Sequence, residues 1–294
     1  MMLLRLIWQI PMTLLVLIMV FVFANEYAVA RSSRRTKDIA YVQANQPGFN
    51  AERQTLDVYT PKNESAKTRP VVVFIHGGAW NSGSKSLYSF VGRRLAKQGI
   101  VAVVVSYRLA PDVEVPAMVD DCGRAVLWTA QHIAEYGGDP NRIFVMGHSA
   151  GGGIAASLST DDPFFARLGL PQNPIKGAIL DDPAGLDMYD YLQKMEYSGD
   201  EKYLIPFGKK PDVWRAMSAL YHVSARCPPV LLYVGERTYP SIAQSTRKFR
   251  QRLQDLGVRH AFTVLPGKKH IPMVTQLFWK NNVIYQGTRK FVGL

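Results

Sequence analysis

Cysteine is scarce in this sequence of 294 residues, and the residue patterns of metal centres are missing. The two cysteines, Cys122 and Cys227, form no C-x-x-C pair, and neither lies near a histidine at metal-ligand spacing. We therefore expect no zinc site, and we expect both cysteines to behave as small hydrophobic residues beside the core. Internal repeats and low-complexity tracts are also missing, so an organisation in repeats is excluded.

Acidic residues are few compared with basic ones. The chain has 23 Asp and Glu residues against 35 Lys and Arg residues, which gives a formal net charge of +12. A basic body can bind an anionic surface such as phospholipid or nucleic acid, but charge alone is not a binding site. The basic residues are scattered and accompany no recognised motif, so we predict no nucleic-acid partner.

The apolar residues that are present are enough for a sizeable core. They make up 47% of the chain and charged residues make up 20%, which excludes wholesale disorder. Over residues 38–294, short apolar runs alternate with longer amphipathic ones, and this alternation predicts one α/β domain with a mostly parallel sheet and helices on both faces. The expected strands cover residues 56–59, 71–75, 100–106, 143–146, 178–180, 230–234 and 261–265, and helices are expected at 116–135 and 241–256.

An almost continuous apolar run covers residues 3–24, and two interpretations of it stay open. In a secretory signal peptide, Arg5 is the basic start and Ala28-Val29-Ala30 is the cleavage site. As an uncleaved anchor, the run has the roughly 20 apolar residues that span a bilayer. We favour membrane association over free secretion, with the side of the membrane open. Residues 1–37 are thus expected to be a signal or anchor with a basic linker.

Residues 185–225 interrupt the alternation and are rich in Tyr, Met and Trp. We expect a helical, cap-like insertion over the carboxyl ends of the strands, where open α/β sheets bind ligands. Its aromatic residues either form the wall of an apolar pocket or pack helix against helix. For most of them, ordinary packing is the favoured interpretation.

The pentapeptide at residues 147–151, GHSAG, lies between an expected strand and a helical run, as the pattern G-x-S-x-G requires. Its serine sits in a strained turn that lifts the hydroxyl clear of the sheet, where side chains at Gly147 and Gly151 would collide. The helix behind it contributes the positive end of its dipole and the free amide of Ala150. We predict that Ser149 is a nucleophile.

A second motif, HGGAW at residues 76–80, follows the strand expected at 71–75. When a serine attacks a carbonyl carbon, an oxyanion forms and needs amide donors, and glycines let the backbone approach it. We predict that the amides of Gly77 or Gly78 act with that of Ala150 as an oxyanion hole.

A serine hydroxyl is a poor nucleophile near neutral pH and needs a base. Two of the six histidines belong to the motifs above, and His270 follows the last expected strand in a Pro-Gly turn. That position fits the chain order serine, acid, histidine, so we predict that His270 is the base.

Several motifs together resemble those of the HGG-containing esterases, a group of α/β-hydrolases with carboxylesterase, hormone-sensitive-lipase-like, feruloyl-esterase-like and kynurenine-formamidase-like members. The motifs are LDVYTP at 56–61, HGGAW at 76–80, YRLAP at 107–111, YGGDPNRI at 136–143, GHSAGG at 147–152 and PGKKH at 266–270. The likeness covers roughly residues 50–294. It implies the α/β-hydrolase fold and serine chemistry with neither metal nor organic cofactor.

The acid of the site departs from the family pattern. The relatives carry an Asp three residues after the glycine that ends the strand at 230–234, and Thr238 stands there in this chain. Glu236 is the first choice to orient His270, and Asp181 or Asp182, with Asp187 nearby, is the second. A Ser–His dyad without an acid is the remaining option, although a missing carboxylate costs about 10⁴ in rate.

We therefore expect a serine hydrolase that cleaves a carboxylic ester of a small molecule through an acyl-enzyme on Ser149. An amidase or formamidase with the same site is an alternative. A ligand-binding member of the fold without turnover is another, and Thr238 is the residue in its favour. The acyl-chain length and the oligomeric state stay open.

Overall fold

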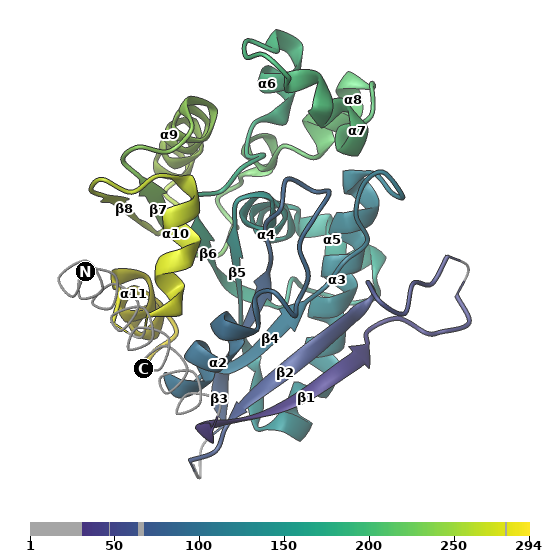
Figure 1. Ribbon diagram of the computed structural model, residues 1–294, viewed down its shortest axis with the longest axis vertical. Coiled ribbons are helices and arrows are strands. Elements are labelled where there is room, and N and C mark those ends of the chain that lie inside the picture. Colours follow the sequence, from purple (N-terminus) through teal and green to yellow (C-terminus); the bar gives the residue numbers. More distant parts are fainter. Residues whose placement is uncertain (1–30, 47, 64–67, 280) are drawn as a thin grey trace, which may run out of the picture.

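The computed structural model describes residues 31–46, 48–63, 68–279 and 281–294. An eight-stranded sheet runs through it in the order β1-β2-β4-β3-β5-β6-β7-β8 (Figure 1). β2 pairs antiparallel with β1 and β4, and the other neighbouring strands are parallel. The strands are β1 (Ser33–Ala40), β2 (Thr55–Pro61), β3 (Arg69–Ile75), β4 (Val101–Val105), β5 (Gly138–His148), β6 (Ile175–Asp181), β7 (Val230–Gly235) and β8 (His260–Leu265).

Helices cover both faces of the sheet, and this is why the sequences of the central strands are continuous apolar runs. Along β3, Val71 and Val73 pack into one core layer, while Val72 and Phe74 pack into the other. The first layer lies under α3 (Val115–His132), α4 (Ala150–Thr160) and α9 (Pro240–Asp255). The second lies under α2 (Ser89–Lys97), α10 (His270–Thr275) and α11 (Val283–Phe291).

The predicted fold class is confirmed, since a mostly parallel sheet carries helices on both faces. Each of the seven expected strands is present, with ends that differ by a few residues from those predicted. The helix expected at 116–135 ends earlier, because its last turn is a separate 3-10 helix, η1 (Ile133–Tyr136). Cys122 and Cys227 are buried free thiols, as expected.

The first strand corrects the boundary that we expected at residue 37. β1 pairs with β2 along most of its length, so residues 33–37 belong to the sheet and not to a linker. Its basic residues suit an edge strand, where charges discourage pairing with another chain. Arg35, for example, lies 2.5 Å from the buried carboxylate of Asp57 on β2.

The apolar run at residues 3–24 and the cleavage site at 28–30 lie outside the described residues. Within the described part of the chain, no helix has both the length and the apolar character needed to cross a membrane.

The insertion at 185–225 forms short helices above the carboxyl ends of the strands (Figure 1). They are α6 (Met188–Lys194), η2 (Asp200–Tyr203), α7 (Leu204–Phe207), α8 (Pro211–Ala216) and η3 (Ala219–His222). Trp80 of the HGGAW motif reaches into this cap, with its ring 4.9 Å from that of Phe207 and 6.0 Å from that of Tyr203. The cap is thereby packed against the loop that follows β3. A further short helix, α5 (Asp162–Arg167), follows α4.

Candidate active site

Ser149 occupies the sharp turn between β5 and α4, with a φ of 55° and a ψ of −125°. A non-glycine residue held in this region costs on the order of 1–3 kcal/mol, which the surrounding packing must supply. The flanking glycines explain how the turn fits. A Cβ atom on Gly147 would lie 2.2 Å from the carbonyl oxygen of Gly151, and one on Gly151 would lie 2.1 Å from that of Ile75. The predicted reason for both glycines is confirmed.

The structure brings Ser149 and His270 together from positions 121 residues apart. His270 begins α10, just after β8, and its Nε2 lies 2.8 Å from the Oγ of Ser149. Both residues are 9% exposed. An imidazole at this distance can accept the hydroxyl proton as the oxygen attacks.

The carboxylate against His270 belongs to Asp182. Its Oδ2 lies 2.6 Å from Nδ1 of His270, and its Oδ1 accepts a hydrogen bond of 2.9 Å from the amide of Gly235. The hydroxyl of Thr238 donates to Oδ2 as well. Asp182 directly follows β6, is fully buried and has a φ of 49°. Asp182 thus holds the acid position from β6, and Thr238 supports it from the position where relatives carry an Asp.

Glu236, our first choice for this role, lies elsewhere, and that expectation is corrected. It is exposed, and its Oε2 accepts a hydrogen bond of 2.6 Å from the amide of Gly267, in the turn before His270. The side chain therefore ties the β7 and β8 turns together at the surface. Among the second choices, Asp187 instead contacts Lys248 at 2.8 Å and the hydroxyl of Tyr221 at 2.9 Å.

One feature of the sequence points to Asp182. Two carboxyl residues, Asp181 and Asp182, stand at the end of an apolar strand, and β6 pairs with both β5 and β7. A residue after β6 is therefore a neighbour of Ser149 on one side and of Thr238 on the other.

The glycine loop lies against the nucleophile. A Cβ atom on Gly77 would come within 2.8 Å of the carbonyl oxygen of His148 and 3.1 Å of the Cβ of Ser149. Gly78 has a φ of 130° and lines the cavity beside Ser149, and Ala150 is the first residue of α4. The predicted donors are thus brought together around Ser149.

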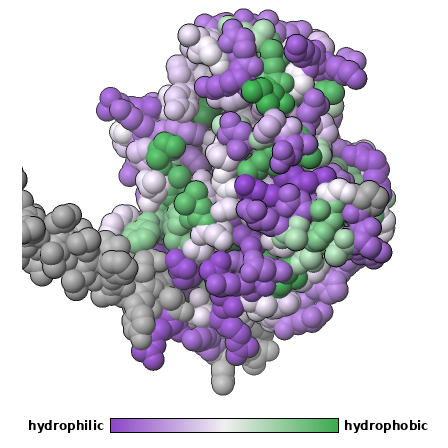
Figure 2. Space-filling view, turned by 45° about the vertical axis from the view of Figure 1, so that its right-hand side comes forward, coloured by the Kyte–Doolittle hydropathy of each residue, from purple (hydrophilic) through white to green (hydrophobic). Residues whose placement is uncertain are grey.

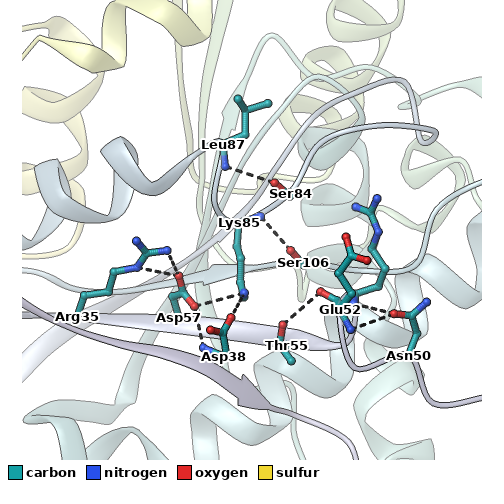
Figure 3. Close-up of polar contacts among 11 residues, drawn as sticks. Arg35, Asp38, Asn50, Glu52, Thr55, Asp57, Ser84, Lys85, Leu87 and Ser106 are labelled. Atoms are coloured by element: carbon teal, nitrogen blue, oxygen red, sulfur yellow. Dashed lines mark hydrogen bonds and ion pairs between the residues drawn. The ribbon is translucent and has the colours of Figure 1, made fainter.

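A network of charges anchors the next part of this loop to the edge of the sheet. Nζ of Lys85 lies 2.5 Å from Asp38 and 3.5 Å from Asp57, which also contacts Arg35 and the amide of Asp38. Figure 3 shows Lys85 between these carboxylates, with its amide bonded to the hydroxyl of Ser106. The nearby Lys85 cation lowers the pKa of Asp38, which favours the charged form of that contact.

His76 stabilises the start of the loop as a neutral ring. Its Nδ1 lies 2.8 Å from the carbonyl oxygen of Gly77, and its face stacks on Tyr107 with ring centroids 4.4 Å apart. Burial lowers the pKa of His76 to about 4, because the site disfavours the cation. Gly83 approaches this ring so closely that a Cβ atom there would lie 2.5 Å from Nδ1.

A cavity of about 680 Å³ opens beside Ser149 and His270, within the range of about 300–1,000 Å³ that is typical of small-molecule sites. Its walls come from the glycine loop, the cap, and the start of α9 and α10. Four aromatic or sulfur side chains of the cap face it, namely Met188, Tyr191, Tyr197 and Tyr203. The pocket-wall interpretation therefore holds for these four, whereas Phe207 and Trp214 are buried in the packing of the cap.

Figure 2 shows hydrophobic residues on the cap and along the middle of the same face, amid mostly hydrophilic surroundings. Among the described residues, no group of three or more His, Cys, Asp or Glu side chains is placed to hold a metal ion.

Comparison with known proteins identifies the family. The BD-FAE family model matches residues 56–253, roughly two thirds of the chain, so the chain belongs to the BD-FAE family. The predicted resemblance to this group of esterases is confirmed.

Curated relatives align over most of the chain. It is 30% identical to the isoprenylcysteine alpha-carbonyl methylesterase of Arabidopsis thaliana over 86% of this chain and 60% of the relative. It is 28% identical to Esterase LipC of Mycobacterium tuberculosis over 81% and 64%, respectively. It is 27% identical to the kynurenine formamidase of Danio rerio over 92% and 88%. The chain thus covers only part of the first relatives that it matches, namely 50%, 60% and 64% of their own lengths.

Solved structures share the fold. Esterase B of Lactobacillus rhamnosis superposes with a TM-score of 0.73 at 21% identity, over 96% of this chain and 91% of that one. A truncated carbohydrate esterase from gut microbiota gives 0.73 at 18% identity, over 89% and 95%. These likenesses confirm the α/β-hydrolase fold.

Proposed function

We propose that this BD-FAE family member is a serine hydrolase that cleaves carboxylic esters through an acyl-enzyme on Ser149. One observation carries the proposal: Ser149, His270 and Asp182 form a continuous hydrogen-bonded line at the wall of a cavity large enough for a small molecule. Relatives named as esterases and a methylesterase support an ester as the substrate.

The geometry assigns a role to each residue. Ser149 Oγ attacks the acyl carbon while Nε2 of His270 takes its proton, and the carboxylate of Asp182 stabilises the imidazolium that forms. The protonated ring then gives its proton to the leaving alcohol. Water repeats the sequence and releases the acid, so the enzyme returns to its starting state.

The amides of Gly77 or Gly78 and of Ala150 hold the oxyanion in both steps. Each donor of this kind contributes on the order of 3 kcal/mol to lowering the barrier. These amides are fixed before the substrate arrives, because the loop is held by His76 and by the Lys85 contacts.

Two alternatives have less support. The argument for a ligand-binding protein without turnover rested on Thr238 in place of an acid, and Asp182 removes that argument because it contacts His270. A formamidase uses the same groups, and one relative is named as such. The test for it is therefore part of the main experiment.

Hydrolysis of p-nitrophenyl acetate, butyrate and decanoate by the wild type and by Ser149→Ala tests the proposal. We expect turnover and fluorophosphonate labelling in the wild type and neither in Ser149→Ala. A folded wild-type protein that neither turns over an ester nor takes the probe would overturn the proposal. A preference of more than tenfold for an N-formyl amide over esters would replace the esterase with a formamidase.

We further propose that the N-terminal segment associates the hydrolase with a membrane. The apolar run at residues 3–24 and the basic residues from Arg31 onward support this location. The full chain should pellet with membranes, and a chain that starts at residue 31 should not. This truncation keeps β1 whole, whereas a start at residue 38 removes most of that strand. If the full chain stays in the supernatant after the membranes are pelleted, the proposed membrane association is wrong, and the esterase proposal is not affected.

A further inference from the structure

A second carboxyl–imidazole pair lies beneath the first. His148 directly precedes Ser149, and its β-sheet partner on β6 is Asp181, which directly precedes Asp182. Nδ1 of His148 lies 3.1 Å from Oδ2 of Asp181 and 3.1 Å from the carbonyl oxygen of the same residue. The pair His148–Asp181 thus lies one residue before Ser149 and Asp182, which both belong to the line through His270.

The two imidazoles are in direct contact. The ring of His148 stacks on that of His270, with centroids 4.8 Å apart and planes inclined by 29°. His148 is 2% exposed, so its position leaves it little freedom to move. Because Nδ1 of His148 faces two acceptors, it donates its proton toward Asp181, and this contact fixes the orientation of the ring beside His270.

The buried carboxyl group of Asp181 is unfavourable for the stability of the fold. It is fully buried, and its Oδ1 has no hydrogen-bond partner within the described part of the chain. A buried acceptor without a partner destabilises a fold, so packing alone does not account for a carboxyl group here. Burial also raises the pKa of Asp181, because it disfavours the charged form of the carboxyl group.

We propose that Asp181 and His148 are positioning residues for His270. His148 provides the surface against which the catalytic imidazole is held, and Asp181 holds the ring of His148 in place through its Nδ1. This inference rests on the proposed function, because it describes how the base of that reaction is positioned.

Charged and titratable groups surround Asp181. Asp182 follows it on the chain, and His148 and His270 face it from β5 and α10. Tyr88, before α2, and Tyr233, on β7, are also close; burial is the main cause that raises the pKa of Tyr88 and raises the pKa of Tyr233 to about 12.

Removing the acceptor should loosen the stacked ring. Asp181→Ala leaves Nδ1 of His148 with the backbone carbonyl oxygen of residue 181 as its acceptor. We expect kcat to fall by about threefold to tenfold, because His270 is then held less firmly beside Ser149. Asp181→Asn keeps a side-chain acceptor for His148 and should restore most of this loss. Asp139→Ala, at the opposite end of the sheet, is the matched control and should leave kcat unchanged.

Replacing the ring tests its packing directly. His148→Asn keeps a donor for Asp181 but removes the surface under His270, so it should lower kcat by about tenfold. A folded Asp181→Ala or His148→Asn with unchanged kcat overturns the inference, and so does an Asp181→Asn that loses as much activity as Asp181→Ala.

A measurement on the wild type covers the case in which a variant does not fold. In protein labelled with ¹⁵N-histidine, Nδ1 of His148 should carry a proton that is hydrogen-bonded to Asp181. An Nδ1 of His148 without a proton contradicts the inference. Failure of the underlying function is a different result, since it appears as full turnover in Ser149→Ala.

Discussion

Thr238 donates its hydroxyl hydrogen to the carboxylate of Asp182. The contact joins the turn after β7 to the end of β6, and it places a neutral donor where the resemblance to the HGG-containing esterases implied an acid. The carboxylate that serves His270 therefore follows β6 in this chain. Because β6 and β7 are neighbours, the two positions lie close enough for the same imidazole to be reached from either.

Asp182 and Glu236 should differ sharply in their importance for turnover. Asp182→Asn removes the charge that stabilises the imidazolium of His270, so kcat should fall by about 10⁴. Glu236→Gln only changes a surface contact to Gly267, and its rate should stay within about threefold of the wild type. Initial rates on a p-nitrophenyl ester measure both. Equal losses in the two variants contradict the assignment of Asp182.

The hydroxyl of Thr238 should itself contribute to rate. Thr238→Val keeps the shape of the side chain but leaves Asp182 without one of its donors, and a hydrogen bond to a charged group is worth about 1.5–3 kcal/mol. We expect kcat to fall by roughly tenfold to a hundredfold. Thr238→Ser retains the donor and serves as the control, with near wild-type activity. If valine and serine behave alike, the hydroxyl has no part in the site.

Lys85 should stabilise the loop that carries the glycine pair. Lys85→Met removes one partner of the fully buried Asp57, which keeps Arg35 and the amide of Asp38, and a hydrogen bond to a charged group is worth about 1.5–3 kcal/mol. Urea unfolding should show a loss of this order, and kcat should fall with it. The exposed pair of Arg167 and Asp161 gives the control, because Arg167→Met should cost less than about 1 kcal/mol. Similar losses in both variants rule out the anchoring role.

Gly83 should tolerate no side chain, although it lies outside the HGGAW motif. It has a φ of 101°, and a Cβ atom would lie 2.5 Å from the carbonyl oxygen of Gly77. Gly83→Ala should displace the glycine loop and lower kcat by on the order of 10² or unfold the protein. Gly137 has a φ of 75° with no atom within 4 Å of the same site, so Gly137→Ala should cost only about 1 kcal/mol. Full activity in Gly83→Ala refutes the claim that Gly83 tolerates no side chain.

His76 should make stability depend on pH in a mildly acid window. Its pKa falls from 6.5 to about 4 on folding, so the unfolded chain binds more protons between these values. The stabilisation is complete above the unfolded value and is lost as the pH falls towards the folded one, by up to about 3 kcal/mol. His76→Asn should show a shallower decline in urea unfolding between about pH 7 and pH 4.5. Parallel declines in the two proteins exclude His76 as the cause.

The sequence by itself determined the fold class, the nucleophile and the base. Apolar runs separated by amphipathic segments report burial on both faces of a parallel sheet, and this is a property of each segment alone. Ser149 and its flanking glycines are determined in the same local way, since a strained turn between a strand and a helix tolerates few residue types. His270 followed from chain order, because the last strand is the one that precedes it.

Only the tertiary structure decided the acid, the first strand and the second imidazole pair. Asp182 reaches His270, and His148 reaches Asp181, because parallel strands distant in sequence lie side by side, and no local pattern records which ends become neighbours. β1 was hidden because an edge strand with one exposed side has no continuous apolar run, and its pairing with β2 is satisfied by backbone bonds and by the Arg35–Asp57 contact. Each of these features depends on which strands lie side by side in the sheet, and the order of residue types along the chain does not record this.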